Sequence, residues 1–351
     1  MRDIADAAGR VIAVGIPGPA LDAATTEAIE AIGPGAVVLF RRNVETPEQL
    51  GALVDALHGL PSRPLVAIDH EGGRVTRLGP PFSAFPPAAE LGRAGVDSAR
   101  AVGEAIGREL ASVGIDVDFA PVLDVGADDA SFVGDRAFSS DARRVAELGL
   151  AFAAGLTAAG VAPCGKHFPG HGATATDSHH ERPVVTRSRA EILERELVPF
   201  RAAAAAHVPM LLSGHVVYPA LDPERIATLS PAIATTFLRH DVGFRGVLWG
   251  DDLSMRAVSD YLTPPEAAVA AIAAGVDGVL IVHDLELGRR AKQQLVAAVE
   301  GGTLPARRLR EAAQRIASVP ARRAAAPLEL PCNAHAELAE RVRVMAATQR
   351  A

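Results

Sequence analysis

Short apolar runs alternate with longer segments of helical period along most of the chain. Each run is four or five residues long and consists largely of Val, Ile, Leu and Ala, which is typical of a buried strand. The sequence therefore predicts eight strands, at Val11–Val14, Ala36–Phe40, Leu65–Ile68, Val117–Ala120, Val161–Gly165, Met210–Ser213, Gly246–Trp249 and Gly278–Val282.

The segments between these runs place Ala and Leu at three- and four-residue spacing, as an amphipathic helix requires. One of them begins with Thr46 followed by Pro47, a capping residue before a first-turn proline. The predicted helices are Pro47–His58, Ala99–Ser112, Arg143–Ala159, Arg189–Ala206 and Pro265–Ala274.

Eight strands that alternate with helices predict an α/β fold with a parallel sheet, either a barrel or a doubly wound sheet. The strand count and the length of 351 residues favour a (β/α)₈ barrel of the TIM type. On the pattern alone the doubly wound sheet remains the alternative, although no Gly-x-Gly-x-x-Gly fingerprint follows the first strand. We expect one barrel domain over residues 1–351.

Beyond Val282 the helical period continues to the end of the chain. Helices are predicted near Leu285–Val299, Pro305–Ile316 and Ala334–Ala347, with a Pro- and Ala-containing stretch before the last of them. We expect the helical extension over about 305–351 to cover one end of the barrel.

Composition narrows the class of protein. Hydrophobic residues make up 49% and charged residues 22%, as in an ordinary globular protein, and 35 Lys and Arg against 42 Asp and Glu disfavour a nucleic-acid partner. Cys164 and Cys332 are too few for a disulfide framework. The first residues do not form a secretory signal, and no run of about eighteen apolar residues occurs. We expect a cytoplasmic protein without a membrane partner, and we favour a monomer.

Unusual polar residues are concentrated directly after the predicted strands. In a barrel, the reacting groups come from the C-terminal ends of strands and from the loops that follow them. Five such segments at the same end of the predicted barrel indicate an active site. They are Asp69–Arg77, Ser131–Arg136, Gly165–Gly172 with the following Asp177-Ser178-His179, Ser213–His215 and Gly250–Met255.

Three of these segments together resemble glycoside hydrolase family 3. The run Lys166–Gly172, which reads Lys-His-Phe-Pro-Gly-His-Gly, is followed by Asp177-Ser178-His179 and resembles the signature of the β-N-acetylglucosaminidases of that family. Asp69–Arg74 and Gly250–Met255 resemble two further segments, with His70 where relatives commonly carry Gln and Gly250 where they carry Ser. The resemblance extends over nearly the whole chain.

This resemblance implies a retaining exo-β-N-acetylglucosaminidase that needs no metal or other cofactor. Its substrate would be a small sugar or a muropeptide with a terminal β-linked GlcNAc, of the kind trimmed during cell-wall recycling. One Trp and two Tyr leave little stacking surface for a long polysaccharide, which also favours a short ligand bound at its end.

The resemblance implies that Asp251 is the nucleophile and His179 the general acid/base, with Asp177 orienting His179. A carboxylate below the anomeric carbon can form a glycosyl-enzyme intermediate, and it must stay ionised to do so. A histidine titrates near neutrality and can donate a proton and then take it back. The alternatives are that Asp251 or Asp252 only caps a helix, and that the loop residues are merely solvated, with His180 as the other candidate acid/base.

The expected sugar-binding residues carry hydrogen-bonding groups suited to hydroxyls and to an acetamide carbonyl. We prefer Arg77 to Arg74 because the family's substrate arginine matches the later position, and we expect Glu71 to be structural. Surface ion pairs are the alternative explanation for the arginines. The set is Asp69, Arg77, Arg136, Lys166 and His167.

Other activities fit parts of the same pattern. Some members of the family transfer GlcNAc to phosphate, and others are β-glucosidases, so a phosphorylase and a β-glucosidase are the alternatives. A sugar-binding barrel without catalysis is a further one. A remote alternative is a metal-dependent barrel hydrolase, with Zn²⁺ held by several of the histidines and Asp177. Against it, Phe168-Pro169-Gly170 cannot form the helix that would align His167 with His171.

Overall fold

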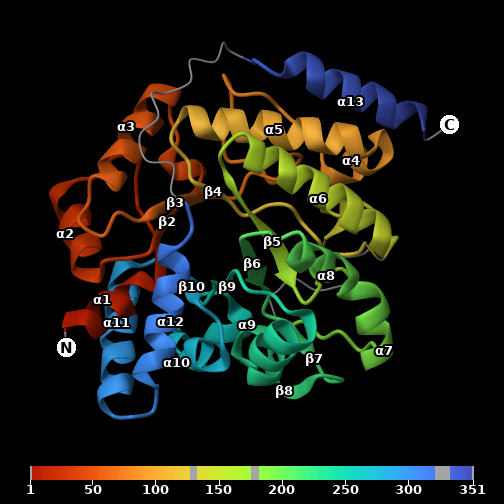
Figure 1. Ribbon diagram of the computed structural model, residues 1–351. Coiled ribbons are helices and arrows are strands. Elements are labelled where there is room, and N and C mark those ends of the chain that lie inside the picture. Colours follow the sequence, from red (N-terminus) through yellow and green to blue (C-terminus); the bar gives the residue numbers. More distant parts are fainter. Residues whose placement is uncertain (1, 127–132, 175–181, 321–332, 350–351) are drawn as a thin grey trace.

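Eight parallel strands close into a barrel in the computed structural model, which describes residues 2–126, 133–174, 182–320 and 333–349 (Figure 1). Strands pair in chain order around the barrel, and β1 closes it against β10. The barrel strands are β1 (Ile12–Gly15), β2 (Ala36–Leu39), β3 (Leu65–Ile68), β4 (Val117–Asp118), β5 (Ala162–Phe168), β6 (Met210–Ser213), β9 (Val247–Asp252) and β10 (Gly278–Ile281). The predicted barrel is confirmed, and each of the eight predicted strands lies within a few residues of its predicted position.

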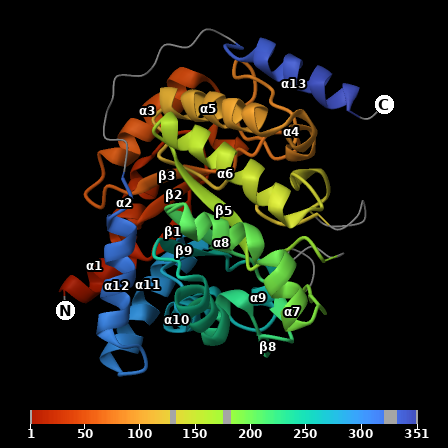
Figure 2. The same ribbon diagram turned by 45° about the vertical axis from the view of Figure 1, so that its right-hand side comes forward.

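Helices surround the barrel, and the predicted ones are all present (Figures 1 and 2). The helices before and after each early strand are α1 (Arg2–Arg10), α2 (Ala23–Ile32), α3 (Pro47–His58), α4 (Ala88–Ala94), α5 (Val96–Ser112) and α6 (Ala142–Ala158). The later ones are α7 (Arg189–Glu191), α8 (Val198–Ala205), α9 (Arg256–Ser259), α10 (Pro264–Ala274), α11 (Leu285–Glu300), α12 (Ala306–Ala317) and α13 (Ala336–Thr348). The remaining helical segments are Arg41–Asn43, Gly134–Arg136, Ile192–Glu196, Ala227–Leu229 and Ala232–Val242.

A two-stranded hairpin interrupts the regular alternation. Strands β7 (Val217–Tyr218) and β8 (Asp222–Ile226) pair antiparallel to each other and stand outside the barrel order, between β6 and β9. The sequence pattern predicts neither, because β7 has only two residues and β8, which reads Asp-Pro-Glu-Arg-Ile, lacks the apolar run of a buried strand. The hairpin leads into the helical turn Ala227–Leu229, which returns the chain to the end of β6.

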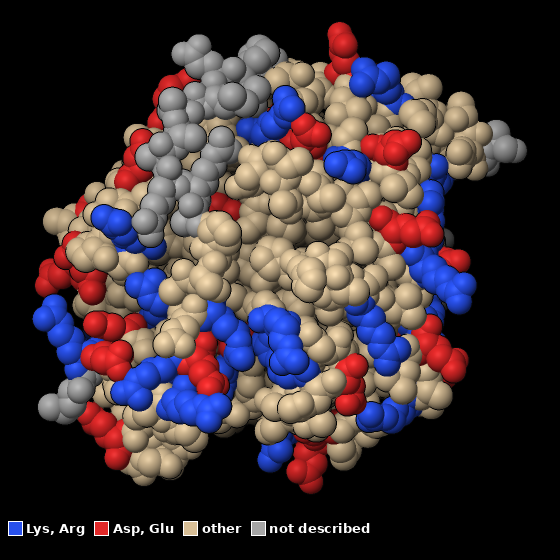
Figure 3. Space-filling model, in the orientation of Figure 1, with Lys and Arg blue, Asp and Glu red and all other residues tan. Residues whose placement is uncertain are grey.

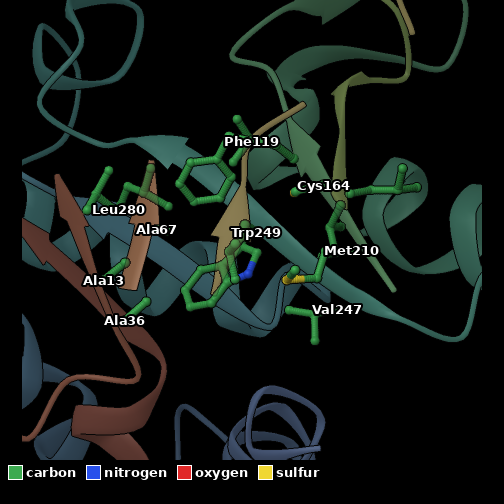
Figure 4. Close-up of a cluster of buried hydrophobic side chains, with 14 of the residues drawn as sticks. Ala13, Ala36, Ala67, Phe119, Cys164, Met210, Val247, Trp249 and Leu280 are labelled. Carbon is green, nitrogen blue, oxygen red and sulfur yellow. The ribbon is translucent and has the colours of Figure 1, made fainter. Parts of the chain in front are cut away.

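Bulky and small side chains share the barrel interior. Trp249 lies in the middle of the barrel, with Ala13, Ala36 and Ala67 to one side and Phe119 above it (Figure 4). A small barrel must match large side chains on some strands with small ones on others. The alanines of β1, β2 and β3 therefore make room for the indole of β9.

The C-terminal extension divides between two places. Ile316 of α12 packs close to Gly35 and Gly278, at the N-terminal ends of β2 and β10, so this helix covers that end of the barrel as expected. Helix α13 does not cover an end: it packs on α4 and α5 at the side of the barrel (Figures 1 and 2). The expectation is therefore right for α12 and wrong for α13.

Helix α13 is fastened to the segment that connects β3 with α4. The carboxylate of Glu109 on α5 accepts hydrogen bonds from the backbone N–H of Ser83, and His335 lies 3.1 Å from the same carboxylate. The backbone N–H of His335 donates to the hydroxyl of Ser83, at 3.0 Å. Since Glu109 is buried, this cluster holds the start of α13 and the β3–α4 connection together.

Among the described residues no helix is both long and apolar enough to cross a membrane. On the face drawn in Figure 3, acidic and basic side chains are interspersed around the edge, while the middle carries few charges.

His335→Ala should lower the free energy of unfolding by about 1–3 kcal/mol, because the buried Glu109 carboxylate loses a hydrogen-bond partner. Urea unfolding of the two proteins measures this difference. A matched control is His240→Ala, which removes an exposed histidine of the segment Ala232–Val242 and should change little. Equal losses for the two variants would show that His335 does not hold α13 in place.

Candidate active site

A cavity of about 280 Å³ opens at the C-terminal ends of the barrel strands. Its walls come from residues on or shortly after β2, β3, β5, β6, β9 and β10, and from the connection that follows β4. Six of the eight predicted site residues line it together: Asp69, Arg77, Arg136, Lys166, His167 and Asp251. The other two, Asp177 and His179, lie outside the described residues, as does His180.

Asp251 stands at an irregularity near the end of β9. Gly250 pairs with Val279 of β10 and Asp252 pairs with Leu280, so the register leaves Asp251 as an extra residue between them. Such a bulge turns a side chain out of the regular alternation of the strand, and bulges are frequent beside active sites. Here it points the Asp251 carboxylate into the cavity.

The pKa of Asp251 is lowered despite its burial. Burial acts to raise the pKa, but His215, His167 and Lys166 and a hydrogen bond from the backbone N–H of Asp252 outweigh it. That N–H lies 2.8 Å from Oδ1 of Asp251. The carboxylate is therefore ionised at neutral pH, as an attacking group must be.

Neither aspartate of this segment caps the helix that follows. The residue before α9 is Met255, which forms no side-chain cap. Asp252 instead accepts hydrogen bonds from the backbone N–H groups of Ser254 and Val282, at 3.2 and 3.4 Å. It thereby fixes the end of β9 to the end of β10, and the capping interpretation of both residues is wrong.

Lys166 is the centre of a buried ion cluster. Its Nζ lies 2.6 Å from Asp69 and 2.5 Å from Glu71, and the side chain is only 2% exposed. Arg136 holds the other side of Glu71 with two parallel hydrogen bonds of 2.8 Å, from Nε and Nη2. Burial opposes the charge on Lys166, but Asp69 and Glu71 raise its pKa, so the ammonium stays charged. Glu71 thus holds two buried cations in place, and it also lines the cavity.

Arg77 lies at the rim of the cavity. Its guanidinium is 3.6 Å from Asp69 and stands over the ring of Phe40, 5.7 Å from the ring centroid. Asp69 thus lies between two cations, Arg77 and Lys166, and one-fifth of its side chain remains exposed. Arg74, the arginine that we did not choose, points instead to Asp135 at 2.9 Å, although it also reaches the cavity wall.

His167 forms a pair with Asp124, which follows β4. Oδ2 of Asp124 lies 2.6 Å from Nδ1 of His167, while Oδ1 accepts the backbone N–H groups of His167 and His171. A carboxylate can only accept, so Nδ1 carries the proton and Nε2 is left for the cavity. Asp124 is fully buried, and its pKa is lowered because His167 outweighs the effect of burial. The structure therefore holds an Asp–His pair on rigid strand ends.

Two buried aspartates near the site, Asp124 and Asp118, are not among the residues predicted from the sequence. Oδ1 of Asp118 accepts the backbone N–H of His70 at 2.9 Å, and burial raises the pKa of this carboxyl well above its usual range. Asp118 ends β4 and Asp124 follows that strand, and in the run Val117–Val125 these two aspartates interrupt a buried apolar stretch. Charged residues are rarely buried without a partner, and that was the available signal.

The described part of the chain contains no cluster of side chains that would support the metal-dependent alternative. His171 approaches Thr174 through Nδ1 at 2.5 Å, and His215 is bonded to Thr228 and to the backbone of Asp252. Among the described residues no three His, Cys, Asp or Glu side chains group as metal ligands would. The segment after His167 is strand as far as Phe168, as the argument from Pro169 predicts.

Asp124→Asn should lower kcat/KM by about tenfold or more on p-nitrophenyl β-GlcNAc, the test substrate that the family resemblance implies. The Asn side chain has one accepting oxygen where Asp124 has two, so it cannot hold both the ring and the backbone N–H groups. His167 then loses its fixed tautomer and orientation. Asp116→Asn is the matched control, because Asp116 is an equally buried aspartate that binds His58 away from the cavity. The interpretation fails if Asp124→Asn keeps the wild-type kcat/KM.

His70→Gln should make the free energy of unfolding less dependent on pH below neutrality. Burial, helped by Arg77, lowers the pKa of His70 to about 4, whereas an unfolded histidine titrates near 6.5. As the pH falls between these values, the unfolded chain binds the proton first, so the free energy of unfolding falls. Gln can still accept from the backbone at this position and does not titrate.

Urea unfolding of the wild type and His70→Gln at pH 7, 5.5 and 4.5 measures this difference. His171, whose pKa burial also lowers to about 4, remains in both proteins and acts as an internal constant. Parallel stability curves would contradict a neutral buried His70.

Known proteins share both the sequence and this geometry. The model of the glycosyl hydrolase family 3 N-terminal domain matches residues 8–319. Beta-hexosaminidase from Nitrosomonas eutropha is 40% identical over 258 residues, which are 71% of this chain and 74% of that protein. Beta-hexosaminidase from Methylococcus capsulatus is 38% identical over 290 residues, 82% and 85% of the two chains.

Two solved structures are also similar. A glycoside hydrolase family 3 beta-N-acetylglucosaminidase from Paenibacillus sp. str. FPU-7 superposes with a TM-score of 0.93 at 34% identity, covering 97% of this chain and 68% of that one. NagZ from Neisseria gonorrhoeae, solved in complex with N-trifluoroacetyl-D-glucosamine, gives a TM-score of 0.75 at 29% identity over 97% and 98% of the chains. The chain therefore belongs to glycosyl hydrolase family 3, and the family predicted from its motifs is confirmed.

Proposed function

We propose that this family 3 enzyme is a beta-hexosaminidase that acts as a retaining exo-β-N-acetylglucosaminidase. The observation that carries the proposal is the ionised Asp251 carboxylate, which a bulge at the end of β9 directs into a cavity lined by Asp69, Lys166 and His167. The relatives named beta-hexosaminidase support the same activity.

In the first step the Asp251 carboxylate attacks the anomeric carbon of a terminal β-linked GlcNAc. The bond to the leaving oxygen breaks as His179 gives that oxygen its proton, and a glycosyl-Asp251 ester forms. In the second step His179 takes a proton from water, and the resulting hydroxide attacks the same carbon. GlcNAc leaves with its β configuration retained, and Asp251 returns as a carboxylate. Asp177 orients His179 through both steps.

The rest of the cavity binds the sugar. Asp69 accepts hydrogen bonds from hydroxyls far from the scissile bond. Lys166 and Arg77, which both lie beside Asp69, donate to hydroxyls in the same part of the sugar. His167 presents Nε2, because Asp124 holds Nδ1. Arg136 gives Nε and Nη2 to Glu71, and this ion pair fixes its guanidinium at the wall of the cavity where the sugar binds. These ion pairs hold the donors in place before the substrate arrives, which limits the cost of ordering them.

The substrate is a short glycan with GlcNAc at its non-reducing end, such as a muropeptide released in cell-wall recycling. Apart from histidines, Phe40 is the one aromatic residue among the described lining residues, so stacking on a chain of sugars has little support. The solved relative with N-trifluoroacetyl-D-glucosamine supports a pocket for an N-acylated glucosamine.

Asp251→Ala should lower kcat for p-nitrophenyl β-GlcNAc by about 10⁴-fold or more, because no glycosyl-enzyme ester can form. Asp260→Ala is the control. Asp260 lies nine residues after Asp251, is half-exposed and pairs with Arg256. Proton NMR of the first-formed sugar measures the anomer, and β-GlcNAc is expected.

Release of the α anomer, or full activity in folded Asp251→Ala, would sink the mechanism. The same assay with p-nitrophenyl β-glucoside, and in phosphate buffer with GlcNAc-1-phosphate as the product sought, separates the hydrolase from a β-glucosidase and from a phosphorylase.

A further inference from the structure

Three buried polar side chains lie behind Asp251 and do not line the cavity. Ser213 ends β6, His215 follows two residues later, and Thr228 lies on the helical turn Ala227–Leu229. Their exposed fractions are 1%, 0% and 0%. Buried polar groups persist in folded proteins when they are hydrogen-bonded, so the partners of these three side chains show what they hold.

The direction of each hydrogen bond follows from the chemistry of the groups. Nε2 of His215 lies 3.1 Å from the backbone carbonyl of Asp252, which can only accept, so Nε2 carries a hydrogen. Burial lowers the pKa of His215, so the ring is neutral at pH 7 and Nδ1 carries no hydrogen. Thr228 Oγ1, 2.9 Å from Nδ1, therefore donates to it rather than to the backbone carbonyls of Gly214 and Ser213, which are farther away at 3.2 and 3.4 Å. Ser213 Oγ lies 3.2 Å from the same hydroxyl and completes the chain.

This chain ends at the bulge that aims Asp251. A bulged residue lacks the regular ladder partner, so other contacts must fix the strand on either side of it. The Asp252 carbonyl held by His215 and the Asp252 N–H that donates to the Asp251 carboxylate belong to the residue directly after the bulge. A rotation of the Asp252 backbone would move both groups and turn the Asp251 carboxylate.

The lack of a side chain at Gly250, directly before Asp251, leaves space for the methyl group of Thr228. A Cβ at Gly250 would lie 2.7 Å from the Thr228 methyl carbon, closer than real Cβ atoms come to a neighbour. The backbone of Gly250 does not have a positive φ, so its conformation does not demand glycine. Glycine is needed there because the methyl of Thr228 fills the space over the β6–β9 pair, where Gly250 stands beside Ser213.

We propose that Thr228 and His215 are positioning residues for the nucleophile. The Thr228 hydroxyl keeps His215 in the tautomer that donates to the Asp252 carbonyl, and this bond holds the bulge so that Asp251 faces the anomeric carbon. Gly250 leaves the room that Thr228 needs. The proposal rests on the proposed role of Asp251 and adds to it the groups that set its direction.

The test compares variants at Thr228. Thr228→Val keeps the shape and removes the hydroxyl, so kcat for p-nitrophenyl β-GlcNAc should fall about tenfold or more with little change in KM. Thr228→Ser keeps the hydroxyl and should retain a kcat near that of the wild type. Thr235→Val is the matched control: its hydroxyl binds the carbonyl of Ala274 at 2.7 Å, away from the site, and kcat should not change.

A second pair of variants tests the packing of Gly250. Gly250→Ala should lower kcat because the new methyl displaces Thr228. Gly250→Ala combined with Thr228→Ser should recover much of it, since Ser lacks the methyl that clashes and keeps the hydroxyl. Thermal unfolding followed by circular dichroism verifies that each variant is folded.

The proposal is overturned if folded Thr228→Val keeps the wild-type kcat, if Thr228→Ser is as slow as Thr228→Val, or if the double variant is no faster than Gly250→Ala. A further experiment distinguishes failure of the positioning role from failure of the proposed function. A fluorosugar traps the glycosyl-enzyme, and peptide mass spectrometry identifies the labelled residue. A label on Asp251 in the wild type confirms Asp251 as the nucleophile, whichever result the Thr228 variants give. A label on another carboxylate overturns both proposals.

Discussion

The buried ammonium of Lys166 is the charge around which the cavity is organised. Removing an unpaired ion from water costs several kcal/mol, so a lysine only 2% exposed requires carboxylates within contact distance. Asp69 and Glu71 meet that requirement, and Glu71 is in turn shared with Arg136. The ion cluster therefore joins β5 to the segment after β3 and to the helical turn Gly134–Arg136. Loss of any member would remove one of the opposite charges that compensate the burial of its neighbours.

The same arrangement suits the neutral, hydroxyl-rich ligand of the proposed function. Cations and carboxylates alternate along the cavity wall, so a sugar hydroxyl meets a donor on one side and an acceptor on the other. Held rigidly, such groups need no rearrangement when a charge develops on the substrate. Asp251 is the exception as far as the described residues go, because its partners there are a backbone N–H and nearby positive charge rather than a direct ion pair. That leaves its carboxylate oxygens accessible to a reacting carbon.

Support for the cavity comes from parts of the chain that are distant in sequence. Helix α13 reaches the β3–α4 connection through Glu109 and Ser83, so the C-terminus is fastened to the segment that follows Asp69 and Glu71. The hairpin β7–β8 delivers Thr228 to the back of β9. Elements that interrupt or extend the regular barrel thus stand directly behind the residues of the site.

The sequence by itself determined the elements and the end of the barrel that carries the chemistry. Period and capping are local, so α3 begins and ends as predicted at Pro47 and His58, and the apolar run Leu65–Ile68 is β3. The motifs identified the family and six of the residues that line the cavity. Tertiary structure alone decided the partners: Asp124 for His167, Thr228 for His215, and the unpaired place of Asp251 between β9 and β10. These depend on strand register and on contacts between distant segments, which leave no period in the sequence.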